Sequence, residues 1–216
     1  MVLILSIETS STTCSVALHQ DGTWLAGTDV VGPYKHANCL MVTIDHLFKV
    51  TQFKIRDLSA VAVAGGPGSY TGLRIGTSVG KGLCFGLDIP LIAIGSLEAL
   101  AYSLCGTTCS NVLLCPVMDA KRDSIYMLIM DHQGHIVRPA FIVKLDESLH
   151  EILPRKPLLF FGDCVKKCQS LLGHYEHVQF LPHMKFSAMH VGALAFLNFR
   201  RGVFQDLLTY EPCYLS

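Results

Sequence analysis

Apolar and polar residues follow the same order twice along the chain. Residues 2–30 read as an apolar strand, an acidic residue, a short polar turn, a second strand, a hairpin turn and a third strand, and residues 112–143 repeat this order. Glu8 lies 14 positions before Gly22, and Asp119 lies 15 positions before Gly134. The hairpin stretches "HQDG" and "DHQG" contain residue types that tight turns require.

A helical pattern follows each set of three strands. We predict helices at about 36–50 and 71–87, with a strand ending in glycines, "LSAVAVAGGPG", between them. The second half gives a helix over 147–153, a strand at "PLLFFGDC" and a helix through Leu172. Both halves therefore read β-β-β-α-β-α. Two unrelated stretches of α/β sequence are the alternative to this internal repeat.

The repeat predicts two subdomains stacked across a cleft, an N-terminal one over residues 1–105 and a C-terminal one over residues 106–216. The first strands would bring Glu8 and Asp119 to the cleft walls. We leave open whether the last helix packs back on the first subdomain.

Composition narrows the class of protein. Half of the 216 residues are hydrophobic and 16% are charged, which favours a sizeable core and argues against disorder. Lys plus Arg and Asp plus Glu both number 17, so the chain lacks the positive charge of a protein that binds nucleic acid alone. No apolar run reaches the length of a membrane span. The start "MVLILSIETS" reads as a buried strand, and nine cysteines without regular spacing favour reduced thiols in the cytoplasm.

Five motifs carry a family resemblance. "LSIETSSTTCSVAL", "HANCLMVTIDHLF", "GGPGSYTGLRIG", "MDAKRDSIY" and "EPCYL" resemble the TsaB (YeaZ-like) family, and they span nearly the whole chain. The resemblance implies a duplicated ribonuclease-H-like fold of the actin/sugar-kinase/heat-shock ATPase superfamily. It also implies a subunit of bacterial tRNA threonylcarbamoyladenosine biosynthesis, once labelled glycoprotease.

The resemblance further implies a set of partners. TsaB-like proteins pair with a catalytic paralogue, TsaD, which transfers threonylcarbamoyl to the adenosine beside the anticodon, and a small ATPase, TsaE, joins them. On this basis we expect no enzyme activity of the chain alone, contact with tRNA only through the complex, and a homodimer as one state of the isolated chain. A self-sufficient small ATPase or kinase and a metallopeptidase are the alternatives.

Two positions argue against metal-dependent catalysis. TsaD-like proteins carry a His-x-x-x-His pair after the glycine loop, and histidines four apart share one helix face. The matching stretch here is "IGSLEALA", with Ser96 and Leu100 at the two positions. Leucine binds no metal, so we expect no metal and no peptidase activity.

We also expect no nucleotide cofactor. "ETSSTT" and "DAKRDS" lack the glycines that let backbone amides approach phosphates. Glu8, Ser10 and Asp119 are the candidates for holding phosphate or Mg²⁺, and capping of the following turns is the alternative role for the two acids. The loop "GGPGSYTG" reads as a strand-to-helix turn, with Ser69 or Thr71 as helix N-cap, rather than a phosphate cradle.

Cys164, Cys168, His174 and His177 form a zinc-like set, but the gap between the pairs is too short for a zinc finger. The alternative is that Cys164 and Cys168 lie on one face of a helix packed on the core. His36 opens a helix after "GPYK", where helix entry or interface packing is favoured over catalysis.

The two predicted helices at 36–50 and 71–87 are the candidate partner surface. Leu40, Ile44, Leu47 and Phe48 form one apolar stripe, whereas Met41 lies off it. Five glycines in the second helix suggest close helix approach, either to the protein's own sheet or to a partner. The predicted interface residues are His36, Leu40, Met41, Ile44, Phe48, Tyr70, Leu73, Arg74, Thr77 and Lys81.

Overall fold

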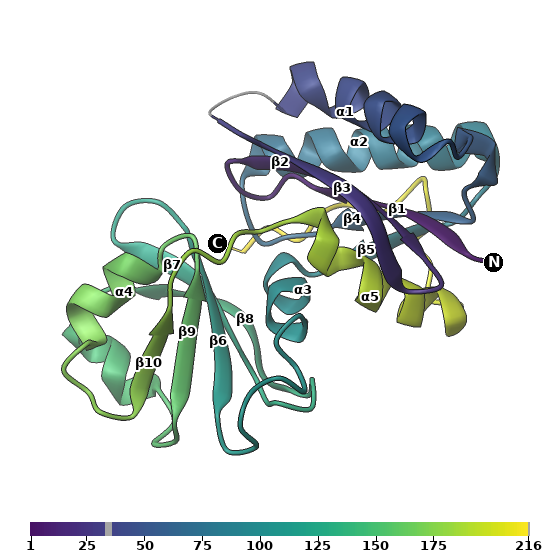
Figure 1. Ribbon diagram of the computed structural model, residues 1–216. Helices are drawn as coiled ribbons and strands as arrows, with labels where there is room; N and C mark the ends of the chain where they lie inside the picture. The colour runs from purple at the N-terminus through teal and green to yellow at the C-terminus, as the bar shows by residue number, and fades with distance from the viewer. Residues whose placement is uncertain (33–35, 216) are drawn as a thin grey trace. The chain divides into compact units, whose positions relative to one another are not determined.

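The computed structural model describes residues 1–32 and 36–215, which form two compact units. Unit 1 consists of residues 1–96 and 186–214, and unit 2 consists of residues 97–185 and Leu215. Each unit has one five-stranded mixed sheet with helices packed on it (Figure 1). We expected the second subdomain to span residues 106–216 and left open whether its last helix packs back on the first. Residues 186–214 group with unit 1.

The sheet of unit 1 has the order β3-β2-β1-β4-β5. Its strands are β1 (Leu3–Glu8), β2 (Thr13–Gln20), β3 (Thr23–Val31), β4 (Ala60–Ala64) and β5 (Leu91–Ile94). β1, β2 and β3 are antiparallel neighbours, while β4 runs parallel to β1 and β5 runs parallel to β4. Helices α1 (His36–Thr51) and α2 (Tyr70–Leu87) cover one face, and α5 (Ala188–Arg200) covers the other (Figure 1). A 3-10 turn, η1 (Ile55–Asp57), precedes β4.

Unit 2 repeats this sheet in the order β10-β9-β6-β7-β8. Its elements are β6 (Leu113–Asp119), β7 (Ser124–Met130), β8 (Ile136–Lys144), η2 (Glu147–Ile152), β9 (Leu158–Gly162), α4 (Val165–Leu172) and β10 (Val178–Leu181), after helix α3 (Ser96–Tyr102) at the boundary. The predicted duplicated α/β fold is therefore confirmed. Two details were wrong: the segment at 147–153 is a 3-10 helix, and each sheet has a fifth, four-residue strand.

None of the helices in the described part of the chain combines the length and apolar character that crossing a membrane requires.

The alternation of side chains along β1 determines the core of unit 1. Leu3, Leu5 and Ile7 point to one side of the sheet, where they pack with Leu40 and Ile44 of α1. All of these side chains are at most 1% exposed. Since residues on a strand alternate between faces, Ile4 and Ser6 lie on the opposite face, toward α5. The central strand is therefore buried on both sides.

The first hairpin follows from its turn residues. Asp21 and Gly22 have φ values of 50° and 83°, as a two-residue type I′ turn requires. The turn connects β2 and β3, whose pairing ends at Gln20 and Thr23. The "HQDG" stretch was therefore correctly interpreted.

A buried histidine lies between the sheet and α5. His19 is 1% exposed. Its Nε2 lies 3.1 Å from the carbonyl oxygen of Met189, and its Nδ1 lies 3.2 Å from the hydroxyl of Ser6. Because a carbonyl only accepts, Nε2 carries the proton and Nδ1 accepts from Ser6. Gly192 makes this approach possible, since a Cβ there would lie 2.1 Å from the ring.

The start of α5 is fixed by a second polar group. Asp29 of β3 accepts hydrogen bonds from the hydroxyls of Ser15 and Ser187, at 3.0 Å for Ser187. Ser187 is the N-cap of α5, and the backbone amide of Ala188 donates to Ser15 at 2.8 Å. A carboxylate near a helix N-terminus is favourable because it faces the positive end of the helix dipole. Residues distant in sequence thus anchor α5 to unit 1.

The buried His19 makes stability depend on pH. Burial lowers the pKa of His19 below 6.5, since the Met189 carbonyl offsets only part of the desolvation and His190 also lowers it. Below pH 6.5 the unfolded chain therefore binds a proton that the folded chain resists, so stability falls as pH falls through this range. The slope contributed by one such group is at most about 1.4 kcal/mol per pH unit.

We predict that urea unfolding between pH 7.5 and about 5 will show this loss. His19→Gln, which keeps a side chain able to hydrogen-bond, should flatten the pH dependence. His46→Gln, at an exposed histidine of α1, should not. An unchanged slope in His19→Gln would assign the effect to other groups.

Candidate functional site

The glycine loop after β4 is packed on two sides by the chain's own backbone. A Cβ at Gly68, where φ is 154°, would lie 2.4 Å from the carbonyl oxygen of Ser10. A Cβ at Gly66, where φ is 104°, would lie 2.5 Å from the carbonyl oxygen of Cys213. Only glycine fits these positions. The loop is therefore a close-packed strand-to-helix turn, as the sequence indicated.

Backbone amides of this loop are already engaged within unit 1. The amide of Gly65 donates to Ile94 at 2.7 Å, and that of Ser69 donates to Ser10 at 2.6 Å. Ser69 is the N-cap of α2, and its hydroxyl accepts from the amide of Gly72. A phosphate cradle needs amides that point at the ligand. The observed pattern instead closes the turn and starts the helix.

Glu8 and Ser10 adjoin this loop at the end of β1. Glu8 is 1% exposed, and its carboxylate accepts a 2.6 Å hydrogen bond from the amide of Ser10. This bond caps the turn after β1, the alternative we weighed against ligand binding. The buried hydroxyl of Ser10 has no hydrogen-bond partner within residues 1–32 and 36–215. A ligand role for Glu8 and Ser10 stays a prediction.

Asp119 of unit 2 also caps its own turn. Its carboxylate accepts from the amide of Lys121 at 3.3 Å and from the ammonium of Lys167 at 3.0 Å. Both partners of the ion pair are about half exposed, so the pair contributes little stability. That Asp119 faces Glu8 across a cleft stays a prediction, because the two residues belong to different units.

The sequence positions examined for metal binding do not form a ligand set. In the described ranges, no three His, Cys, Asp or Glu residues lie close enough together to hold a metal ion. Ser96 and Leu100 are both 1% exposed. Cys164 and Cys168 are buried in the core of unit 2, whereas His174 and His177 are exposed. A hydrogen bond with Cys168 and burial raise the pKa of Cys164, which disfavours the thiolate that a metal requires.

Five of the predicted interface residues are core residues of unit 1. Exposed fractions are between 0 and 8% for Leu40, Ile44, Phe48, Leu73 and Thr77. The stripe Leu40, Ile44, Leu47 and Phe48 packs on the sheet, not on a partner. The helical period correctly predicted one apolar face. Burial of these five side chains within unit 1 argues against their predicted contact with a partner.

The other five residues reach the surface or the edges of the helices. Met41 and Tyr70 are 49% and 53% exposed. Arg74 is exposed, and Lys81 and His36 are partly buried. The Nε2 of His36 lies 3.0 Å from the carbonyl oxygen of Ser11, so this histidine links the start of α1 to the turn after β1. The contact supports the helix-entry interpretation of His36.

The C-terminal segment occupies part of the predicted surface. The Arg74 guanidinium donates to the hydroxyl of Tyr214 at 3.3 Å and lies 4.2 Å above the ring of Tyr70. The rings of Tyr70 and Tyr214 are 4.9 Å apart. The contacts of Arg74 and Tyr70 with Tyr214 join residues at least 140 positions apart, which helical periodicity does not reveal. Tyr70 and Arg74 are thus partly engaged within unit 1.

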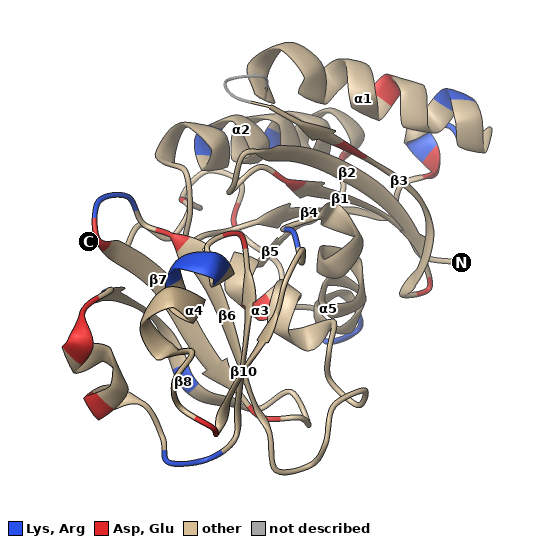
Figure 2. Cartoon of the chain, turned by 60° about the vertical axis from the view of Figure 1, so that its left-hand side comes forward, with Lys and Arg blue, Asp and Glu red and all other residues tan. Residues whose placement is uncertain are grey.

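The exposed sides of α1 and α2 carry further apolar residues that sequence reasoning missed. Val42 and Val50 of α1 are 67% and 63% exposed, and Phe85 of α2 is 84% exposed. Phe85 follows Gly82 by three positions, one helical turn along the same side. Charged residues are sparse along both helices (Figure 2). We call the set Met41, Val42, Val50, Gly82, Phe85 and Gly86 the α1–α2 surface.

The glycines of α2 divide into two groups. Cβ atoms at Gly72, Gly76 and Gly80 would lie 2.1–2.6 Å from Thr9 or Val63, so these three allow the helix to approach its own sheet. Cβ atoms at Gly82 and Gly86 would meet nothing within 4 Å. Packing within unit 1 therefore explains the first group but not the second.

Comparisons with known proteins agree with this architecture. A family model described as "TsaD: tRNA N6-adenosine threonylcarbamoyltransferase" matches residues 33–187. The tRNA threonylcarbamoyladenosine biosynthesis protein TsaB of Bacillus subtilis is 35% identical over 164 residues, which cover 74% of this chain and 70% of the relative. TsaB of Escherichia coli is 31% identical over 57% of this chain and 52% of its own length.

Solved structures give the same fold. YeaZ from Pseudomonas aeruginosa superposes with a TM-score of 0.79 at 24% identity, over the full length of both chains. An activator of 2-hydroxyisocaproyl-CoA dehydratase from Clostridium difficile, with bound ADPNP, superposes with a TM-score of 0.57 at 9% identity, over 93% of this chain and 97% of the activator. At these identities the structures show the fold alone.

The two repeated units and these neighbours define an actin/sugar-kinase/heat-shock-ATPase-like fold. The 35% identity to B. subtilis TsaB decides the family within that class. The family model that matches residues 33–187 is described as TsaD and does not separate the two names. The chain belongs to the TsaB (YeaZ-like) family of tRNA threonylcarbamoyladenosine biosynthesis.

The two glycine groups predict opposite effects of alanine. Gly76→Ala should destabilise the isolated chain by roughly 1–3 kcal/mol, because the added methyl overlaps Thr9. Gly82→Ala should stabilise it by about 0.5–1 kcal/mol, because alanine favours a helix interior and the site is open. Urea unfolding of both variants measures the difference. Equal destabilisation would mean that Gly82 has a contact within the chain.

Proposed function

We propose that the chain is a non-catalytic subunit that binds and activates a TsaD-like catalytic paralogue during threonylcarbamoyl transfer to the tRNA adenosine next to the anticodon. The complex also recruits a TsaE-like ATPase, and tRNA meets this chain only through the complex. The cytoplasm is the compartment in which this chemistry would take place. Family membership gives the pathway, and the α1–α2 surface supplies the argument for a partner.

The observation that carries the proposal is the exposed position of Phe85 between Gly82 and Gly86. A phenylalanine 84% exposed leaves most of its ring in water. The two glycines lower the stability of α2 and have no neighbour within unit 1 that requires them. A second protein whose helix packs against this side would cover Phe85 and use the space above both glycines. One partner thus accounts for both features.

The residues off the core-facing stripe of α1 extend this surface. Met41, Val42 and Val50 are all at least 49% exposed. Aromatic residues and methionine are enriched in the centres of protein interfaces, where charged residues are depleted. The same chemistry suits a second copy of this chain, so a homodimer is the expected competitor when the paralogue is absent.

The partner's catalytic role follows from what the chain lacks. Ser96 and Leu100 stand where TsaD-like proteins carry their His-x-x-x-His pair, and both are buried. Transfer would therefore take place on the paralogue. Neither peptidase nor transferase activity is expected of this chain alone.

A self-sufficient ATPase of the same fold is the second candidate. The dehydratase activator with bound ADPNP shares the fold, which is the observation in its favour. Against it, the amides of Gly65 and Ser69 are bonded within the chain, and Ser10 lies against Gly68. Calorimetric titration of the isolated chain with Mg-ATP separates the candidates. Micromolar affinity at the glycine loop after β4 would favour the ATPase, and the subunit proposal expects no nucleotide binding at that loop.

The partner surface is testable with one pair of variants. We predict that Phe85→Asp will weaken binding to the TsaD-like protein by about tenfold or more, since it places a charge on the apolar α1–α2 surface. Leu208→Asp is the matched control, because Leu208 is 89% exposed in unit 1 but lies outside α1 and α2. Surface plasmon resonance gives the affinities, and mass spectrometry of tRNA gives the modification yield.

The variant pair also shows what would contradict the proposal. Circular dichroism should show that both variants remain folded, because both substituted positions are exposed. Equal affinity of Phe85→Asp and the unchanged chain would place the interface elsewhere. Modification of tRNA by this chain without any partner would refute the non-catalytic role.

A further inference from the structure

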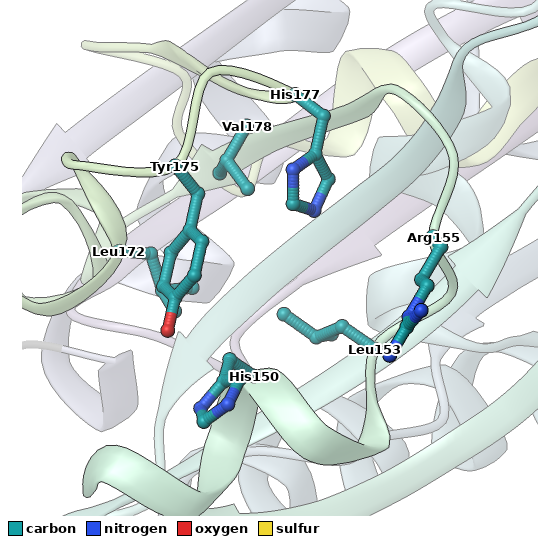
Figure 3. A pocket seen from close by; sticks show the side chains of 7 residues that line it. All are labelled: His150, Leu153, Arg155, Leu172, Tyr175, His177 and Val178. Atoms are coloured by element: carbon teal, nitrogen blue, oxygen red, sulfur yellow. The ribbon is translucent and has the colours of Figure 1, made fainter.

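Unit 2 contains an open pocket that the proposed partner surface does not involve. Its volume is about 450 Å³, within the range of small-molecule sites. Its lining residues come from η2, the segment after it, the end of α4, the segment between α4 and β10, and the start of β10. Figure 3 shows these side chains arranged around a common space.

The floor of the pocket is apolar. Leu153, Leu172 and Val178 belong to the hydrophobic core of unit 2 and are at most 8% exposed. They therefore present fixed aliphatic surface to anything that enters. A ligand that covers this floor would gain free energy from removing apolar surface from water.

Aromatic rings form one wall. The rings of Tyr175 and His150 are stacked with centroids 5.5 Å apart and planes 20° apart, and His177 meets Tyr175 edge-on at 5.9 Å. The Nδ1 of His150 donates to the carbonyl oxygen of Glu147, which leaves Nε2 as the acceptor of this ring. Tyr175 also contacts the ring of His174, with centroids 4.0 Å apart, so its ring is held by several neighbours. Contact of a planar ligand with the part of the Tyr175 ring that faces the pocket then costs little further ordering.

The charge of the lining is positive. Arg155 is exposed at the rim and carries the permanent charge among the lining residues, which include no carboxylate. Its guanidinium offers a planar fork of donors that matches phosphate or carboxylate oxygens. Lys156 is the next residue and is also exposed, but it does not line the pocket. In Figure 3 the Arg155 side chain stands across the pocket from Tyr175.

We propose that this pocket binds a planar aromatic molecule that carries one phosphate or carboxylate group. The ring lies against Tyr175 and over Leu153 and Val178, and the anionic group pairs with Arg155. This site is separate from the α1–α2 surface, so it does not depend on the proposed partner.

Four probes test the two parts of this chemistry. NMR titration of the ¹⁵N-labelled chain with AMP and with indole-3-acetate should shift the amide signals of His150, Tyr175 and His177, with dissociation constants of roughly millimolar or tighter. Adenosine lacks the charge, and inorganic phosphate lacks the ring, so each should bind about tenfold more weakly or not at all. Binding of AMP alone would identify a phosphate ligand, and binding of indole-3-acetate alone a carboxylate ligand.

Substitutions in and beside the pocket test which side chains bind the probe. Arg155→Gln should weaken binding of the anionic probe by about tenfold, whereas Lys156→Gln should change it less than about twofold. Tyr175→Leu, which keeps an apolar side chain, should also weaken it by about tenfold. Thermal unfolding checks that each variant is folded.

Several results would overturn the proposal. The first is that neither AMP nor indole-3-acetate shifts the three signals at millimolar concentration. The second is that adenosine binds as tightly as AMP, and the third is that Lys156→Gln weakens binding as much as Arg155→Gln.

Discussion

Burial of the unit 1 sheet on both faces is the constraint from which the other features follow. Leu3, Leu5 and Ile7 must be covered on one side, and that cover comes from the apolar stripe of α1 and from α2. A helix has one such stripe, so Leu40 and Ile44 are unavailable to a partner. Whatever binds to this side of the molecule must use residues that lie off the stripe, such as Met41 and Phe85.

The same constraint explains why α2 is rich in glycine. Close approach to β1 and β4 requires a helix surface without Cβ atoms at Gly72, Gly76 and Gly80, where Thr9 and Val63 lie beneath. On the opposite side of the sheet, Gly192 does the same for α5 over His19. Gly82 and Gly86 have no such neighbour. These two glycines lower the stability of α2, and packing within unit 1 gives no reason for their presence.

Local features were the ones that the sequence predicted well. The Asp21–Gly22 hairpin, the N-cap at Ser69 and the extents of α1 and α2 follow from turn chemistry and from the helical period. The four-residue strands β5 and β10 were missed because so short an apolar run carries little period. The docking of Tyr214 on Arg74 depends on contacts 140 residues apart, which no local pattern encodes.

The candidate site was only partly predictable for a related reason. Periodicity identified an apolar stripe at Leu40 and Ile44 but could not say whether a sheet or a partner covers it. Because both side chains are buried in the folded unit, the sheet is what covers this stripe. The pocket beside Tyr175 was also not predicted, because its lining brings η2, α4 and the segment between α4 and β10 together only in the folded unit.

Amide hydrogen exchange of the chain, alone and with the TsaD-like protein, tests whether the α1–α2 surface is the partner interface. Added protection on complex formation should concentrate in peptides from the α1–α2 surface, above all those containing Phe85 and Val42. Protection confined to other elements, with α1 and α2 exchanging as in the isolated chain, would contradict it.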